Sequence, residues 1–314
     1  MVPWQPSASL PILRRRAQFL ADIRAFFAER DVMEVDTPLL SSFGVTDLHL
    51  ENFRTEDGRF LQTSPEYAMK RLLAAGSGDI YQLSHVFRKD ETSKRHNAEF
   101  TLLEWYRLGW NDRALMDEVA QLCRQLAGRP DLKSESLSYV QAFSLANLPD
   151  PHTSSLALLQ QVAAERLACE TERWRRDDCL DGLMALVVEP LLPPDQLTFV
   201  TLYPASQAAL ARQEAHGGVH LARRFELYWQ GMELANGYWE LTDAAEQRSR
   251  FEADNEQRRL LGRQEAAQDA RLLAAMQAGL PDCAGVALGV DRLLMIIAGE
   301  KRISDVLPFD ADRA

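Results

Sequence analysis

The chain has 314 residues but only four cysteines, namely Cys123, Cys169, Cys179 and Cys283. No two of them form a C-x-x-C pair, and none stands beside a histidine at the spacing of a zinc site. We therefore expect reduced and mostly buried thiols. The sequence also lacks an apolar run long enough to cross a bilayer, and its first residues lack the charge order of a signal peptide. These absences predict a cytoplasmic protein without a membrane partner.

An excess of basic residues is missing as well. The chain contains 35 Lys and Arg against 46 Asp and Glu, which gives a formal net charge of −11. Because nucleic-acid binders usually carry basic surface to neutralise phosphates, this balance argues mildly against RNA as the main partner. There is no internal repeat and no Walker-type phosphate loop, so any nucleotide must be held in another way.

Apolar residues recur at helical spacing over residues 12–27, which predicts an amphipathic helix that ends near Asp31. The segment VMEVDTP follows and is predicted to be extended, because its proline cannot continue a helix. Short strands are expected around LHLENF and RFLQT. SPEYAMKRLLAAG predicts a helix with Ser64 as N-cap and Gly76 as stop. IYQLSHVFR and EFTLLEWYRL then predict an antiparallel hairpin with a long basic tip.

Residues from about 112 to 195 are predicted to be helical, and TFVTLYP is predicted to be a strand. RRFELYWQGMELANGYWEL predicts a second hairpin that turns near Gly231, and a charged helix is expected from about Asp243 to Gln268. GVALGVDRLLMIIAG predicts a strand that runs into an apolar helix. Mostly antiparallel strands with packed helices indicate an α+β fold. We expect one domain over residues 1–314, with a helical insertion at about 112–195.

The basic tip of the first predicted hairpin is a candidate phosphate site. Arg88, Lys94, Arg95 and His96 would neutralise a triphosphate, and Phe100 would lie against a purine face. On this segment alone, a solvated charged tip with Phe100 in the core is the favoured alternative.

Glu226, Glu233 and Glu240 recur every seven residues in the second predicted hairpin. Carboxylates that converge there would form a magnesium site together with phosphate oxygens. The alternative is a polar sheet face. The apolar and aromatic neighbours weaken this alternative, because buried carboxylates without a cation are costly.

The GVALGVDRLL segment is the third candidate. Gly285 and Gly289 would allow a ligand close to the backbone, and Arg292 begins a helix. Taken alone, this segment indicates only a strand that turns into a helix.

Taken in chain order, the EVDTP, FRKDE…RHNAEFTLLEWY and GVALGVDR segments resemble motifs 1, 2 and 3 of the class II aminoacyl-tRNA synthetases. TSPEY and MELANGYWEL are similar to the lysyl subgroup. The resemblance runs from about Leu10 to the end and lacks the anticodon-binding domain of lysyl-tRNA synthetases. This compact form, with WQPSAS, PASQA and PDCAGVALGVDR, resembles the elongation factor P–(R)-β-lysine ligases, which modify a translation factor instead of tRNA.

The resemblance implies a class II catalytic fold, ATP with Mg²⁺, and (R)-β-lysine or lysine as the amino acid. It implies elongation factor P as the protein substrate, with tRNA disfavoured. It also implies a homodimer formed through the first helix and residues 32–38. Two alternatives stay open: a small synthetase that transfers lysine to tRNA or another acceptor, and a non-catalytic regulatory paralogue.

The resemblance assigns roles to individual residues by the motif positions they match. Arg88 and Arg292 are the implied catalytic residues, which hold the α-phosphate and the bent ATP. The residues implied for ATP binding are Arg88, Asp90, His96, Asn97, Phe100, Glu233, Leu234, Gly289 and Arg292. The residues implied for the lysine substrate are Ser64, Glu66, Glu104, Tyr106, Glu240 and Ala287. Glu226 and Glu233 match carboxylates linked to magnesium.

Three positions depart from the pattern of the lysyl synthetases. Asp90 replaces the usual glutamate that contacts the adenine amino group, and Ala98 replaces the usual proline in the HNPEF sequence. Ala287 stands where motif 3 normally has a glycine. Its methyl group is expected to crowd the α-carbon of the substrate and so to favour a β-amino acid.

Overall fold

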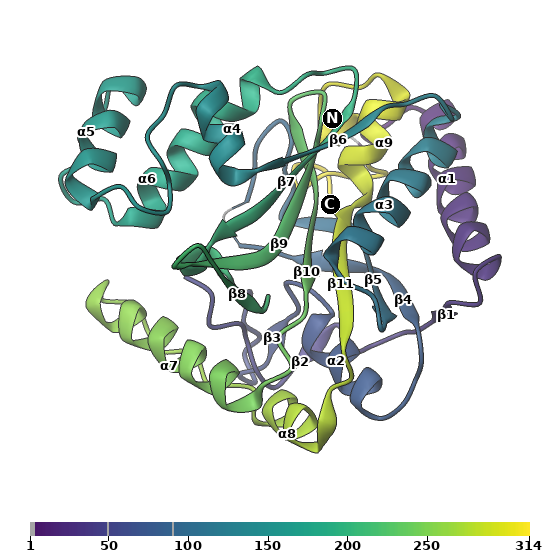
Figure 1. Cartoon of the computed structure of the whole chain (residues 1–314). Coiled ribbons are helices and arrows are strands. Elements are labelled where there is room, and N and C mark those ends of the chain that lie inside the picture. The colour runs from purple at the N-terminus through teal and green to yellow at the C-terminus, as the bar shows by residue number, and fades with distance from the viewer. Residues whose placement is uncertain (1–3, 49, 90) are drawn as a thin grey trace. The chain divides into compact units, whose positions relative to one another are not determined.

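The computed structural model describes residues 4–48, 50–89 and 91–314. The chain forms two compact units (Figure 1). Unit 1 comprises Met1–Trp110, Gln125–Gly128 and Thr242–Ala314, and unit 2 comprises Asn111–Arg124 and Arg129–Leu241. A single domain over the whole chain stays a prediction.

Unit 1 contains helices and strands from both ends of the chain. Its helices are α1 (Leu10–Ala28), α2 (Glu66–Ala74), α7 (Ala244–Leu260), α8 (Ala270–Gly279) and α9 (Val290–Ala298), with a short 3₁₀ turn at Ile303–Asp305. Its strands are β1 (Met33–Glu34), β2 (Leu40–Ser41), β3 (Phe60–Leu61), β4 (Ile80–Phe87), β5 (Glu99–Leu108) and β11 (Cys283–Gly289).

The main sheet of unit 1 has the strand order β1-β4-β5-β11. Strand β1 runs parallel to β4, whereas β5 is antiparallel to both β4 and β11, which confirms the first predicted hairpin. Helices α1 and α9 lie side by side (Figure 1). Phe27 of α1 stacks on Tyr81 with 4.4 Å between ring centroids and meets Trp105 edge-on at 5.4 Å. Because side chains alternate along a strand, the residues on either side of Trp105 face the opposite side of the sheet.

Unit 2 contains the long second hairpin and a group of helices. Its helices are α3 (Asp112–Ala127, whose last residues belong to unit 1), α4 (Tyr139–Leu145), α5 (Leu156–Leu167) and α6 (Arg176–Leu183), which is continued by a π-helical turn at Met184–Val188. Its strands are β6 (Ser134–Ser138), β7 (Leu197–Pro204), β8 (Gln213–His216), β9 (Val219–Trp229) and β10 (Met232–Trp239).

Strands β10, β9, β7 and β6 follow one another in the sheet of unit 2, and β8 also pairs with β9. Helices α4, α5 and α6 form a group, drawn in teal in Figure 1. Their buried side chains share one apolar core with residues of β7 and β9, including Val200, Tyr203 and Tyr228. The helices therefore cover one face of this sheet.

The α+β class is confirmed, but three local predictions were wrong. Strand β6 lies inside the segment predicted to be helical, where it pairs parallel with β7. The LHLENF strand does not form among its described residues, which make only a bridge from Glu51 to Lys89. The predicted Asp243–Gln268 helix already ends at Leu260, because Gly262 adopts a positive φ that ends the helical path.

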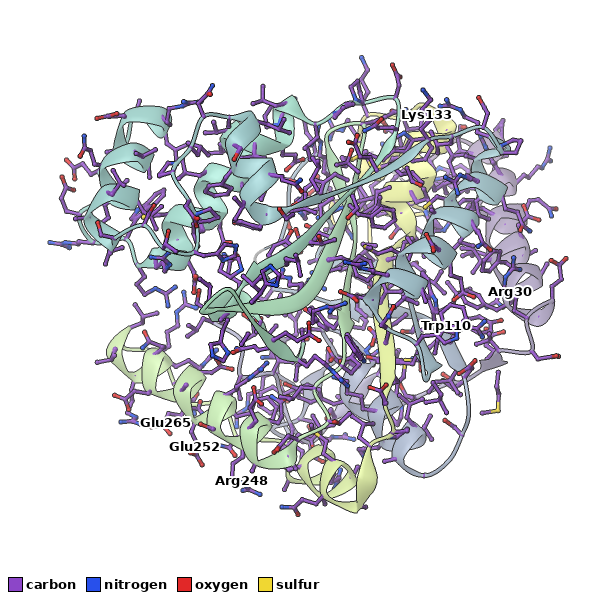
Figure 2. All side chains as sticks on the ribbon, in the orientation of Figure 1. Arg30, Trp110, Lys133, Arg248, Glu252 and Glu265 are labelled. Carbon is purple, nitrogen blue, oxygen red and sulfur yellow. The ribbon has the colours of Figure 1, made fainter. Side chains whose placement is uncertain are left out.

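Helix α7 carries charge on its solvent side, as predicted. Gln247, Phe251 and Asn255 are buried at a spacing of four residues and form one stripe of the helix. Arg248 and Glu252 are exposed and point outward (Figure 2).

None of the four cysteines forms a disulfide, and all except Cys169 are buried, as expected. Among the described residues, no helix is both long and apolar enough to cross a membrane.

Candidate active site

Glu104 of β5 is a buried carboxylate, and each of its two oxygens accepts a hydrogen bond. Ser64 Oγ donates to Oε2 at 2.6 Å, and Tyr106 Oη donates to Oε1 at 2.7 Å. The residue is 2% exposed. Burial, and after it the charge of Glu66, raises the pKa of Glu104 to about 7. Since burial disfavours the ionised form, a cationic ligand beside this carboxylate would be strongly favoured.

Helix α2 supplies the second carboxylate of this cluster together with a cation of its own. Glu66 lies in the first turn, and Lys70 Nζ is 2.7 Å from Glu66 Oε1. Lys70 is 1% exposed and lowers the pKa of Glu104, against the effect of Glu66. The sequence reasoning missed Lys70, although its position four residues after Glu66 is the spacing of a helical ion pair.

The start of α2 differs slightly from the predicted cap. The helix begins at Glu66, and Pro65 precedes it. Ser64 Oγ accepts a hydrogen bond from the backbone N–H of Glu66 at 3.0 Å while it donates to Glu104. One hydroxyl therefore holds both the helix start and the carboxylate.

The neighbours of Glu104 across the sheet lie on the same face. Gln82 of β4 and Ala287 of β11 are its direct partners in register. Directly opposed residues have Cβ atoms about 4.5–5.5 Å apart, so the methyl group of Ala287 lies beside Glu104. Along β11 only Ala287 and Gly289 are partly exposed, whereas the other residues of the strand are buried. Close approach of a ligand was predicted at Gly285 and Gly289; Gly289 is partly exposed, whereas Gly285 is buried, so the approach at both glycines stays a prediction.

Gln82 is a residue of this face that the sequence reasoning missed. Its Oε1 accepts from the backbone N–H of Thr37 at 3.0 Å, and its buried Nε2 has no hydrogen-bond partner among the residues that the structure describes. A buried donor without an acceptor is costly, so the Nε2 group of Gln82, with its two N–H bonds, is available for a substrate carboxylate or carbonyl. A glutamine inside an apolar strand was the only signal in the sequence.

The β4–β5 connection brings the predicted phosphate residues of unit 1 together. The guanidinium carbon of Arg88 lies 5.2 Å from the centroid of the Phe100 ring. Phe100 is partly exposed, so it is not the core residue of the alternative interpretation. Arg88 also lies 3.8 Å from Glu91. Asp90 lies outside the described residues.

Arg292, in the first turn of α9, reaches the same connection. Its Nη2 donates to Nε2 of His96, and His96 Nδ1 lies 2.7 Å from Ser93 Oγ. Burial, and after it the positive charge of Arg292, lowers the pKa of His96. The ring is therefore neutral at pH 7, with Nε2 as acceptor and Nδ1–H as donor to Ser93.

Asn97 links the β4–β5 connection to two backbone segments. Its Nδ2 donates to the carbonyl of Glu99 at 2.7 Å, and its Oδ1 accepts from the N–H of Ala311 at 3.1 Å. The residue is 7% exposed. These bonds fix the connection to the C-terminal segment. A direct contact of Asn97 with ATP stays a prediction.

A bulge in the second hairpin orients its carboxylates. Strand β10 pairs Glu233 with Tyr228 and Asn236 with Glu226, and the register shifts between Glu233 and Ala235. Glu233 and Asn236 are three residues apart and would face opposite sides of a regular strand. The extra residue of the bulge instead places Glu233, Asn236 and Tyr238 on one face. Continued alternation from Tyr238 leads to Glu240, which is 1% exposed. Leu234 lies inside the bulge and is buried.

Glu226 already has protein partners, and its predicted link to magnesium stays a prediction. Its Oε2 accepts from Tyr203 Oη and Tyr228 Oη at 2.6 Å each, and its Oε1 pairs with Arg224 Nη2 at 2.5 Å. Burial and the charge of Glu226 raise the pKa values of both tyrosines, so they remain donors. Protein groups thus satisfy the carboxylate.

The second carboxylate predicted for magnesium is Glu233 of β10. Glu233 is partly exposed, and its magnesium role stays a prediction, as does the predicted role of the buried Glu240 in binding the lysine substrate. In the part of the chain that the structure describes, no three acidic, His or Cys side chains gather as a ready-made metal site. An ion bound here would take the rest of its ligands from phosphate oxygens and water, as magnesium commonly does.

The large, mostly antiparallel sheet flanked by helices is the architecture of a class II synthetase domain. The family described as tRNA synthetases class II (D, K and N) matches residues 5–313, and the chain belongs to this family. Its curated relatives include proteins named elongation factor P–(R)-β-lysine ligase. The one from Pasteurella multocida is 47% identical over 99% of this chain and 98% of the relative. Those from Proteus mirabilis and Haemophilus influenzae are 48% and 46% identical with the same coverage.

Proposed function

We propose that the protein is an ATP-dependent ligase that activates (R)-β-lysine and transfers it to a lysine side chain of elongation factor P. The full-length similarity to ligases of that name supports the reaction class and the acceptor. The observation that carries the choice of amino acid is the position of Ala287 directly opposite Glu104.

The buried carboxylate cluster of unit 1 supports a cationic amino acid as substrate. Glu104 is held by two donors and its pKa is raised, so an ammonium group would stabilise its ionised form. The Ala287 methyl group occupies space that a glycine would leave open beside Glu104. A β-amino acid carries its amine one carbon further from the carboxylate and would avoid that methyl group. A difference of one methylene-sized group in a pocket changes discrimination about ten- to two-hundred-fold.

The proposed reaction has two steps. A carboxylate oxygen of the amino acid attacks the α-phosphorus of ATP, the bond from that phosphorus to the bridging oxygen breaks, and pyrophosphate leaves. The lysine amine of the acceptor then attacks the acyl carbon, the acyl–phosphate bond breaks, AMP leaves, and the amine loses a proton. Arg88 and Arg292 would stabilise the charge that develops on the phosphates, and Phe100 would stack on adenine.

Catalysis of this kind requires no covalent nucleophile of the enzyme. Positioning and electrostatics suffice when charged donors are already in place. The neutral His96 ring accepts a hydrogen bond from Arg292 and carries no charge of its own, so it does not repel the guanidinium. The positive charge of Arg292 is then available to the phosphates. A magnesium ion bound with ATP would add positive charge at the phosphates. A translation factor as acceptor would place the reaction in the cytoplasm.

The test is amino-acid-dependent ATP–pyrophosphate exchange with (R)-β-lysine and with α-lysine. We expect the wild type to prefer (R)-β-lysine, and Ala287→Gly to shift the ratio of the two kcat/KM values about tenfold or more toward α-lysine. The matched control is Ala284→Gly, which removes a methyl group from the same strand on the opposite face. A wild-type preference for α-lysine would contradict the proposed substrate, and an equal shift in both variants would remove the role of Ala287.

A further inference from the structure

Asp291, the residue that precedes Arg292, is part of a closed ring of buried polar contacts between three elements. Its Oδ2 accepts from the backbone N–H of Thr101 on β5 at 2.7 Å, and its Oδ1 pairs with Nη1 of Arg16 on α1. Arg16 Nη2 completes the ring by donating to Thr101 Oγ1 at 2.7 Å. The three residues are between 1% and 8% exposed.

The ring fixes the position of the first turn of α9 relative to β5 and α1. A negative charge in that turn is favourable for the helix dipole, and the paired guanidinium neutralises it inside the protein. Replacement of either charged partner would leave the other buried without a counter-charge. The start of α9 is therefore held by an ion pair and by a backbone hydrogen bond, and not by apolar packing alone.

Two residues that adjoin members of the ring in the chain, Arg292 and Phe100, are predicted ATP residues. Arg292 follows Asp291 in the chain and donates to His96. Phe100 precedes Thr101 on β5 and lies under Arg88. The contact between Asp291 and Thr101 thus links the backbone that carries Arg292 to the backbone that carries Phe100.

We propose that Asp291 and Arg16 are positioning residues for ATP, which hold Arg292 at a fixed place relative to Phe100. This inference rests on the proposed function, because it takes Arg292 and Phe100 as ATP contacts. Neither Asp291 nor Arg16 touches the nucleotide in this account. A positional error of about 1 Å in a catalytic group costs on the order of a hundredfold in rate, so loss of the ring should affect ATP use well beyond its effect on folding.

The chain contains a matched control at the other end of β5. Asp79 accepts from the backbone N–H of Leu108 at 2.7 Å through one oxygen and pairs with Arg107 Nη1 at 2.9 Å through the other. It repeats the contacts of Asp291 with a strand N–H and an arginine, but it adjoins no predicted ATP residue. Asp79→Asn therefore reports what the loss of such a bridge does to folding alone.

The experiment compares Asp291→Asn and Asp79→Asn in pyrophosphate exchange, at a temperature below the unfolding midpoint of every variant. We expect both substitutions to lower Tm. Asp291→Asn should also lower kcat/KM for ATP about tenfold or more and leave KM for the amino acid within about twofold. Asp79→Asn should leave kcat/KM for ATP within about twofold. Arg16→Lys, which keeps the charge but cannot bridge both partners, should reproduce the ATP effect if Asp291→Asn fails to fold.

A double substitution tests whether the effect passes through Arg292. When binding of ATP is measured by calorimetry, Asp291→Asn should weaken it in the wild-type background and have little further effect in the Arg292→Ala background. Equal losses in both backgrounds, or equal kinetic losses in Asp291→Asn and Asp79→Asn, would overturn the inference. Absence of exchange in the wild type would instead overturn the proposed function.

Discussion

Glu104 is the residue whose burial and charge most clearly indicate a cationic ligand. Its two hydrogen bonds come from neutral hydroxyls, and its negative neighbour Glu66 is only partly offset by Lys70. The raised pKa follows from this environment and has consequences for both stability and binding.

We predict that amino-acid binding tightens as the pH rises through about 7, because an ammonium group binds the ionised form of Glu104. Glu104→Gln should weaken binding and remove this pH dependence. The measurement is KM for the amino acid in exchange between pH 6 and pH 8. Glu99→Gln, on the exposed start of the same strand, is the control. An unchanged pH profile in Glu104→Gln would contradict the assignment.

Ionisation of Glu104 should lower the stability of the fold, although it strengthens binding of the amino acid. The pKa of Glu104 in the folded protein lies above the ordinary glutamate value of 4.5, so the folded state binds more protons than the unfolded chain between about pH 4.5 and 7. Stability should therefore fall as the pH rises through this window and become constant above it. Glu104→Gln should flatten this part of the stability curve, as measured by denaturant unfolding.

The individual residues show how far the sequence alone could lead. Glu66, Glu104 and Tyr106 were predicted from the family resemblance, and the structure places them beside one another or beside shared neighbours. Lys70 and Gln82 were missed, because a lysine on a helix and a glutamine on a strand are ordinary surface residues until packing covers them. Glu226 was predicted from residue type and spacing, and only the fold shows that two tyrosines and an arginine bond to its oxygens, so its link to magnesium stays a prediction.

At the scale of elements, the long periodic segments were predictable and the short or irregular ones were not. The β4–β5 hairpin and helix α1 follow from clear alternation and clear helical spacing. The bulge in β10 leaves no such trace in the sequence, although it determines which carboxylates share a face. Strand β6 depends on pairing with β7, far along the chain, which local patterns do not encode.

The ion pair between Glu66 and Lys70 on helix α2 should influence how amino-acid binding depends on pH. Lys70 is paired with Glu66 inside the protein and lowers the pKa of Glu104, so Lys70→Met should raise the pH midpoint of amino-acid binding. Arg250→Met removes the cation from another pair at the same spacing, on α7, and should leave the midpoint unchanged. The measurement is again KM against pH. A midpoint that does not move in Lys70→Met would mean that this ion pair only stabilises α2.

At the scale of the whole molecule, the predicted homodimer has physical support on the N-terminal segment. Trp4, Leu10, Met33 and Leu39 are 40–80% exposed, although all four are large and apolar. Strand β1, which contains Met33, lies at the edge of the unit 1 sheet. Exposed apolar residues at a sheet edge are typical of a surface that another chain covers.

We predict a dimer by light scattering at micromolar concentration, and a shift toward monomer in Met33→Glu. Leu186→Glu introduces the same charge at a residue of unit 2 that is 67% exposed and should leave the dimer intact. A monomeric wild type, or equal dissociation in both variants, would show that residues 32–38 are not the dimer interface.

The most direct test of the account is transfer to the acceptor, followed by intact mass spectrometry. The protein is incubated with ATP, magnesium, (R)-β-lysine or α-lysine, and either elongation factor P or lysine tRNA. We predict that elongation factor P gains the mass of one β-lysyl group, more rapidly than with α-lysine, and that tRNA is not charged at a comparable rate. Efficient charging of tRNA with α-lysine, without modification of elongation factor P, would contradict the proposed function.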